Sequence, residues 1–283
     1  MQGRVGLGKR GVLRLQFESD DRGRSILRDL YRETPIIVQQ ALYFDEQMPG
    51  LPCVYVLSSG GPVVEGDSYL HTITLKEGAC AHISTGAATK VAQMSGGCAS
   101  LNQMIELRTD AYLEYLPEPT IPCAGSRYRV DSRLVVASSA TLFYSDIYLC
   151  GRRYSGEQFL YQQLDVATRL EREDGTLLFC DRQVAEPALA GFGGVGVMAG
   201  WEVFATVLIA APSDVVNDLY SAIEPRMGQR VALGVHLLPF DAGVVCRIMG
   251  HESQEVKGVV RELCSMLRQR VHGVALPDEF VWR

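Results

Sequence analysis

The chain has 283 residues, of which 47% are hydrophobic and 21% are charged, a composition typical of a soluble globular protein. Its formal net charge of -6 and its pI near 5.5 argue against a nucleic-acid-binding protein, because phosphate binding requires clustered lysine and arginine. Arg127, Arg129 and Arg133 are close in sequence, but Asp131 lies among them. We therefore expect no nucleic acid among the partners.

The compartment is inferred from three further features. The first eleven residues are rich in glycine and arginine and lack the apolar segment of a secretory signal. The longest uncharged run, residues 187–201, contains five glycines and is too short for a bilayer-spanning helix, so we expect a buried strand and turn there. The eight cysteines form no C-x-x-C pair. We expect a cytoplasmic protein without membrane contact, whose thiols are reduced and mostly buried.

Alternation of apolar and polar side chains predicts strands throughout the first half of the chain. Residues 12–17 alternate as a half-buried strand does, and the charged tract at residues 18–28 is predicted to be a loop or connector. Residues 69–75 and 80–84 are predicted to be strands joined by a turn of hairpin length at residues 76–78. Further strands are predicted at residues 35–38, 54–57 and 101–107.

The clearest strand signal lies at residues 128–136. One face carries Tyr128, Val130, Ser132, Leu134 and Val136, and the other face carries the charged residues. Further strands are predicted at residues 141–149, 159–170, 176–180 and 201–209. About a dozen short strands at regular spacing predict a mainly β fold, with a solenoid-like or sandwich architecture.

Helical periodicity appears only near the C-terminus. Ser213 is predicted to cap a helix that ends before Pro225, and a second helix follows Ser253 and ends at Gly273. Three arginines are expected on the polar faces of the late helices: Arg261, Arg268 and Arg270. Between the helices, residues 230–238 and 244–249 predict a strand pair. We expect one domain over residues 1–283, with the helix-strand-strand-helix segment at about 212–273 packed on it.

Two runs resemble nucleotide-binding motifs but lack the context that these motifs need. Residues 191–196 match G-x-G-x-x-G, yet strand-forming residues follow where a helix should begin, so a turn between strands is predicted. Lys90 follows Gly86 by four residues, but Thr89 stands where a P-loop has its second glycine. We expect neither a dinucleotide nor a nucleotide site.

One pair of residues could contact a metal ion. Cys80 and His82 share a strand face at positions i and i+2, so both could reach one borderline ion. Two ligands do not close a site, and a buried cysteine beside a hydrogen-bonded histidine is the alternative. The pair is therefore a secondary candidate.

Three acids lie on stiff or glycine-rich corners. Glu118 is held between Pro117 and Pro119, Asp67 follows Gly66, and Glu157 lies in the polar corner at residues 151–159. The constrained backbone at such a corner presents the carboxylate in a defined position. A turn-stabilising or solvated role is the alternative for each.

Four runs, taken in order, resemble the urease accessory proteins of the UreD/UreH family. They are residues 60–67 (GGPVVEGD), 87–90 (AATK), 113–121 (LEYLPEPTI) and 151–159 (GRRYSGEQF). The ending at residues 277–282 (PDEFVW) also fits. The resemblance covers most of the chain and implies a mainly β, solenoid-like fold with two helices.

The resemblance also implies a function without catalysis. Such proteins are scaffolds or chaperones that act with UreF and the GTPase UreG to place nickel in apo-urease, conducting the ion through an internal passage. We therefore expect no permanently bound cofactor and transient contact with Ni²⁺. Asp67, Glu118 and Glu157 are the candidate contacts, with Cys80 and His82 as the alternative pair.

Two other functions remain open from the sequence. One is an enzyme of unknown chemistry that uses Asp67, Glu118 and Lys90 around a pocket. The other is a purely structural adaptor without an ion path. Co-purification with UreF and UreG would support the family interpretation, whereas turnover by the isolated chain would support the enzyme.

Overall fold

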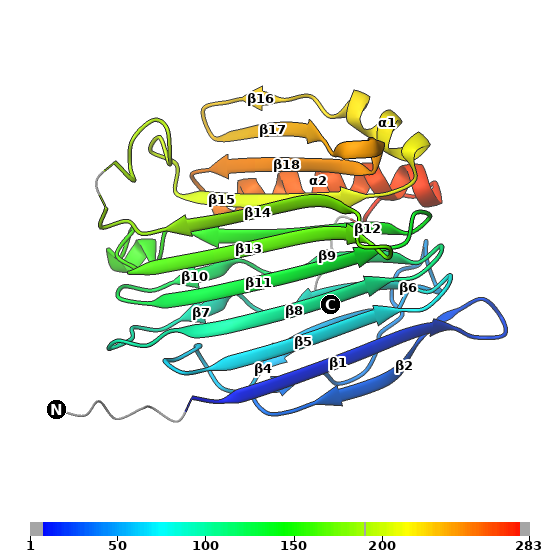
Figure 1. The fold of residues 1–283 in the computed structure, drawn as a ribbon, viewed down its shortest axis with the longest axis horizontal. Helices are drawn as coiled ribbons and strands as arrows, with labels where there is room; N and C mark the ends of the chain where they lie inside the picture. Colours follow the sequence, from blue (N-terminus) through cyan, green and yellow to red (C-terminus); the bar gives the residue numbers. More distant parts are fainter. Residues whose placement is uncertain (1–7, 190, 278–283) are drawn as a thin grey trace.

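Two β-sheets packed face to face form most of the computed structural model, which describes residues 8–189 and 191–277 (Figure 1). The seven-stranded sheet has the spatial order β14 (Leu177–Ala185), β13 (Gln163–Arg172), β11 (Arg127–Val136), β8 (Ala99–Leu107), β5 (Ser68–Leu75), β1 (Arg10–Ser19) and β2 (Ser25–Arg32). The predicted mainly β architecture is confirmed.

The second sheet has eleven strands. Its main path is β16 (Arg226–Met227), β17 (Val231–Leu237), β18 (Gly243–Gly250), β15 (Val203–Ala210), β12 (Thr141–Leu149), β9 (Tyr112–Leu116), β6 (Cys80–Thr85), β4 (Cys53–Ser58) and β3 (Ile36–Ile37). Two short strands lie off this path: β7 (Thr89–Val91) pairs with β10 (Thr120–Pro122), which also pairs with β12.

The middle of the chain visits the two sheets in turn, which produces stacked coils. β5, β8, β11 and β13 are parallel neighbours in the first sheet, and β6, β9 and β12 are parallel neighbours in the second. The expected hairpin turn between residues 69–75 and 80–84 is wrong, because β5 and β6 belong to different sheets. The turn at residues 76–78 is a corner of one coil.

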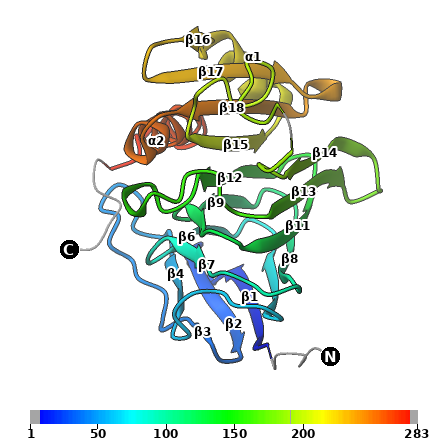
Figure 2. The same ribbon diagram turned by 90° about the vertical axis from the view of Figure 1, so that its left-hand side faces the viewer.

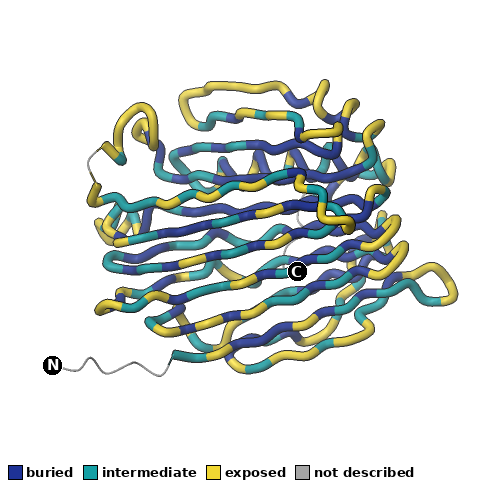
Figure 3. Tube along the Cα trace, viewed as in Figure 1, coloured by how far each residue is buried: buried dark blue, intermediate teal, exposed yellow. Residues whose placement is uncertain are grey.

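Parallel pairing in register aligns like side chains into rows across the first sheet. Leu15, Ile73, Ile105, Leu134 and Leu170 are successive neighbours in one such row, and all are buried. Rows of this kind bury apolar surface continuously along the stack, as expected for coils that cannot bury it alone. Figure 3 shows the burial along the strands and the exposure at the turns.

Two segments differ from the prediction. Residues 18–28 are not a connector, because β1 continues to Ser19 and β2 begins at Ser25. β2 is an edge strand with one exposed face, so it tolerates charges that resemble a loop in the sequence. The described part of residues 187–201 forms largely exposed turns and no strand. Residues 191–196 are a turn between β14 and β15, as predicted.

The helices α1 (Ser213–Ala222) and α2 (Ser253–His272) cover the outer face of the second sheet (Figure 2). Ser213 does not cap α1, because it is the first helical residue and Pro212 occupies the capping position. Gly273 ends α2 at φ 73°, as predicted.

The segment between the helices extends the second sheet. The predicted strand pair is confirmed as β17 and β18, and β18 also pairs with β15. Two single-turn 3-10 helices, η1 (Arg153–Ser155) and η2 (Pro239–Asp241), lie in loops. In the described ranges, none of the helices has the length and apolar character that crossing a membrane would require.

Candidate functional site

Asp67 is buried in the corner before β5, where it binds the backbone of its own corner and of the segment that leads into β1. Its carboxylate accepts hydrogen bonds from Lys9 N at 2.7 Å and Val64 N at 3.0 Å. A third bond comes from the Tyr69 hydroxyl at 2.9 Å. The glycine before Asp67 adopts φ 83°, a conformation that favours glycine and makes this tight corner accessible.

Glu157 and Glu118 are also held by defined partners. Glu157 accepts a hydrogen bond from Ala124 N at 3.0 Å and pairs with Arg152, and the hydrogen bond from Arg152 holds the pKa of Glu157 below its ordinary value. Both carboxylate oxygens of Glu118 bind Lys257 Nζ of α2, at 2.7 and 2.8 Å.

The three acids lie near the same end of the sandwich, close to the starts of β5 and β13 and the end of β9. Within the described residues, no hydrogen bond or ion pair joins any two of them. Each fixes a different corner of the fold. Lys90, which the enzyme alternative places beside Asp67 and Glu118, is exposed and is not among the described hydrogen-bond or ion-pair partners of either acid.

Cys80 and His82 lie on the helix-facing side of β6 but bind different partners. The Cys80 thiol is 3.2 Å from Ser25 Oγ, whereas His82 Nδ1 is 2.7 Å from Glu114 Oε2. In residues 8–189 and 191–277, no group of three or more His, Cys, Asp or Glu side chains is arranged to hold a metal ion.

Glu114 is the centre of a buried charge network between β9 and α2. It accepts a hydrogen bond from the Tyr112 hydroxyl at 2.6 Å, and its Oε1 lies 3.0 Å from Arg268 Nε. Arg268 also pairs with buried Asp45. Burial alone would raise the pKa of Glu114, but the bond with His82 and the charge of Arg268 together hold it below its ordinary value.

Arg268 therefore corrects one expectation from the helical pattern. The sequence placed it on an exposed polar face of α2, but the side chain is completely buried. Arg268 can be buried because its guanidinium pairs with two buried carboxylates, those of Asp45 and Glu114. Neither is adjacent to α2 in the sequence, so helical periodicity alone could not reveal the burial.

A row of polar side chains crosses the inner face of the first sheet. Its successive neighbours are His71, Gln103, Ser132, Thr168 and Asp181. The row of aliphatic residues from Leu15 to Leu170 lies two positions further along the strands. Burial lowers the pKa of His71 to about 4, so its imidazole is neutral at physiological pH. The interior between the two sheets is therefore not uniformly apolar.

The second sheet presents polar groups to this row. Tyr115 donates to Gln103 Oε1 at 2.6 Å, and Gln103 Nε2 donates to Ser132 Oγ at 3.0 Å. Tyr144 lies 3.0 Å from the same Ser132 oxygen and donates to Asp146 Oδ2 at 2.6 Å. Burial raises the pKa of Asp146 to about 7, although the bond from Tyr144 opposes this shift.

Further polar side chains extend this set to β15 and β18 of the second sheet. Thr206 is the strand neighbour of both Asp146 and Arg247. Arg247 binds Thr206 Oγ1 at 2.5 Å and Asp181 Oδ2 at 2.6 Å, which joins the two sheets. We call the whole set the polar seam: His71, Gln103, Tyr115, Ser132, Tyr144, Asp146, Thr168, Asp181, Thr206 and Arg247.

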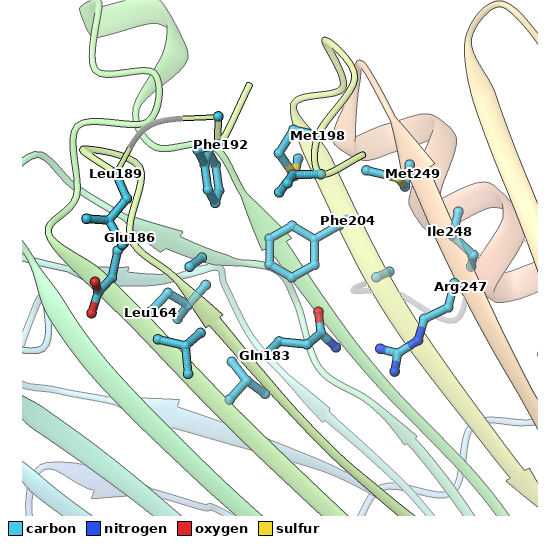
Figure 4. Close-up of a pocket in the computed structure, with 16 residues that line it drawn as sticks. Leu164, Gln183, Glu186, Leu189, Phe192, Met198, Phe204, Arg247, Ile248 and Met249 are labelled. Atoms are coloured by element: carbon cyan, nitrogen blue, oxygen red, sulfur yellow. The ribbon is translucent and has the colours of Figure 1, made fainter. Parts of the chain in front are cut away.

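A pocket of about 550 Å³ opens where the seam reaches the surface (Figure 4). Phe204 lies at its centre, with Gln183 and Arg247 on one side and Phe192 and Met198 on the other (Figure 4). None of the five candidate metal contacts predicted from the sequence lines this pocket.

The comparisons with known proteins decide the family. A family model described as UreD urease accessory protein matches residues 9–283. The chain belongs to the UreD family. All four runs that carried the resemblance lie within the matched residues, so that prediction is confirmed. In the ending at residues 277–282, only Pro277 lies within the described residues.

Curated relatives match over nearly the whole chain. Proteins named urease accessory protein UreD 2 from Brucella ovis and Brucella suis are each 37% identical over 279 residues, covering 97% of this chain and 92% of theirs. One named urease accessory protein UreD 3 from Methylorubrum populi is 39% identical over 281 residues, covering 98% of this chain and 90% of its own.

The family run at residues 113–121 supplies side chains to three separate parts of the structure. Because β9 alternates, Glu114 faces α2 and Tyr115 faces the sandwich interior. Glu118 follows the strand and binds Lys257. A lone acid within the apolar residues 112–116 was the signal for Glu114, and the lone acid within residues 141–149 was the signal for Asp146.

Proposed function

We propose that this chain is a non-catalytic accessory protein of urease maturation, which acts in the cytoplasm with UreF and UreG to insert nickel into apo-urease. The observation that carries this proposal is the family match over residues 9–283. The relatives from Brucella and Methylorubrum bear the name urease accessory protein over almost the same length. Ni²⁺ is then a cargo and not a resident cofactor.

The polar seam supports an internal route for the ion. A divalent cation that enters protein must exchange water for oxygen or nitrogen groups, since a dry apolar interior would impose a large electrostatic cost. The seam offers hydroxyl, amide, imidazole and carboxylate groups across the width of the sandwich. Asp146 is its buried acid, and an arriving cation would favour its ionised form.

The corner acids Asp67, Glu118 and Glu157 remain part of the proposal as contacts at one end of the sandwich. Each already has partners in this structure, so an arriving ion would have to replace those bonds. Cys80 and His82 remain the alternative contacts. Weak, exchanging contacts suit a carrier, because a route that bound the ion tightly would not release it.

The test is urease maturation in cells that express apo-urease, UreF and UreG with variants of this chain. Asp146→Asn removes the buried charge at constant shape, and Asp131→Asn is its control, because Asp131 is half-exposed on the outer face of β11. We expect Asp146→Asn to lower urease-bound nickel while UreF still co-purifies. Asp131→Asn should leave both unchanged.

The two other functions predict different results. A structural adaptor would mature urease normally whatever the seam variant, provided that the complex forms. An enzyme would turn over a substrate as the isolated chain and lose that turnover with Asp67→Asn, Glu118→Gln or Lys90→Met. Normal nickel loading without this chain would refute the proposal as a whole.

A further inference from the structure

The main paths of the two sheets end at four strands, three of which are short or carry exposed charges. β3 and β16 have only two residues each. β2 carries exposed charges at Asp29 and Arg32. Short strands and charges are the usual means by which proteins blunt an open edge. The fourth edge, β14, is nine residues long.

The last part of β14 lacks such protection. Residues 183–185 carry no charge and border the pocket described above (Figure 4). Val184 is 50% exposed on its rim, and Leu189 is 62% exposed. In the described ranges, β14 pairs only with β13. η2 contacts β14, but no backbone hydrogen bond between the two is present among those residues.

The sheets also end at different places. The first sheet stops at β14, whereas the second continues past β15 to β18, β17 and β16 (Figures 1 and 2). Phe204 and Met249 thus form the floor of the pocket on the inner face of the second sheet, where no strand of the first sheet lies opposite. One more strand on β14 would continue the first sheet over this floor.

The polar side chains of the pocket are already engaged. Gln183 binds Asp181 at 2.9 Å, Arg247 binds Asp181 and Thr206, and Glu186 accepts a bond from Gln163 at 2.6 Å. An occupant therefore gains mainly apolar contacts from the side chains. The unpaired backbone of β14 is the remaining source of directional bonds.

We propose that β14 accepts an extended segment of a partner protein as an added strand, with the apolar side chains of that segment covering the pocket floor. The inference rests on the proposed function, which makes the partner a member of the accessory complex. The segment would be a short, uncharged run rich in β-branched or aromatic residues, because such residues suit a half-buried strand. A docked helix would leave the β14 backbone unpaired, since a helix satisfies its own backbone groups.

The test measures amide hydrogen exchange in the chain alone and in its co-purified complex with UreF and UreG. In an edge strand, successive amides point to opposite sides, so every second amide of β14 is free. We expect these alternate amides at residues 181–186 to exchange at least about tenfold more slowly in the complex. The amides of edge strand β2 should not change.

A substitution pair supplies the second readout. Val184→Asp places a charge on the rim of the pocket, and Leu70→Asp places one on the outer face of β5, where Leu70 is 41% exposed. Both sites are exposed enough for the fold to tolerate the charge. We expect Val184→Asp to weaken complex formation by at least about tenfold, which is a typical loss for a central contact, and Leu70→Asp to have no effect.

The outcomes separate this inference from the proposed function. A complex that forms without protection of β14 overturns the added strand alone. Loss of binding by Val184→Asp without β14 protection identifies a docked helix and also overturns it. Protection that grows with the concentration of the isolated chain identifies a second copy instead of a partner. Failure of the wild-type chain to join UreF or UreG overturns the proposed function and this partner together.

Discussion

The guanidinium of Arg268 and the carboxylate of Glu114 form a fully buried ion pair, with Nε 3.0 Å from Oε1. This pair links the last turns of α2 to the middle of β9. Lys257 and Glu118 form a second link between α2 and the segment after β9. Two ion pairs thus hold α2 against β9 and the segment after it, in addition to the packing of the apolar face of α2.

Removing Arg268 should destabilise the fold strongly. Arg268→Met keeps the apolar stem but removes the guanidinium that pairs with the buried acids Asp45 and Glu114, which we expect to cost about 3–5 kcal/mol of the free energy of unfolding. Arg230→Ala is the control, because Arg230 is 80% exposed in its pair with Glu255 and should cost at most about 1 kcal/mol. Urea unfolding measures both, and equal costs would contradict the assigned burial.

The raised pKa of Asp146 predicts how the free energy of unfolding changes with pH. The folded state binds this proton up to about pH 7, whereas an unfolded aspartate releases it near pH 4, so stability falls as the pH rises through this window. The loss amounts to about 4 kcal/mol, since each pKa unit is worth about 1.4 kcal/mol. Asp146→Asn should flatten the curve of unfolding free energy between pH 4 and 7. An unchanged curve would contradict the assignment.

Glu114 should have the opposite effect on stability: protonating it at low pH should destabilise the fold. Its pKa is lowered in the folded state, so its contribution is complete above the unfolded value and is lost as the pH falls through the folded value. We expect wild type to lose more stability than Glu114→Gln on acidification below about pH 4. Unfolding midpoints at successive pH values would measure the difference, and parallel curves would refute it.

The Lys257 and Glu118 pair separates a structural role from an ion contact. If Glu118 only anchors α2, then Glu118→Ala and Lys257→Ala break the same bond and should impair urease maturation equally. We expect Glu118→Ala to impair maturation more, because the ion would also lose an oxygen ligand. The pair is partly exposed, so either change should cost at most about 1 kcal/mol of stability. Equal activities would assign Glu118 to the fold alone.

The alternating strands could be predicted from the sequence because they depend on local periodicity. Tyr128, Val130, Ser132, Leu134 and Val136 all face inward, as the pattern indicates. The connection at residues 76–78 was predicted wrongly as a hairpin, because a three-residue turn does not reveal whether the next strand returns to the same sheet or crosses to the facing one. That choice depends on the distant pairing of β5 with β1 and β8.

The candidate site was predictable only in part. Asp67, Glu118 and Glu157 could be found because glycine and proline mark the corners that hold them. Asp146 and Arg268 lie within regular elements, and their importance arises from partners on other strands and loops. The polar seam likewise depends on the register of strands from separate parts of the chain, as in the pairing of Asp146 with Thr206, which single-strand patterns do not contain.

The most direct test of nickel carriage through the sandwich is the nickel content of urease matured in the presence of Asp146→Asn. This variant should be more stable than wild type near neutral pH, because it removes a costly buried charge. A loss of function therefore could not be attributed to unfolding. We predict a several-fold fall in urease-bound nickel with UreF still co-purified. Full nickel loading by this more stable variant would contradict the proposed route.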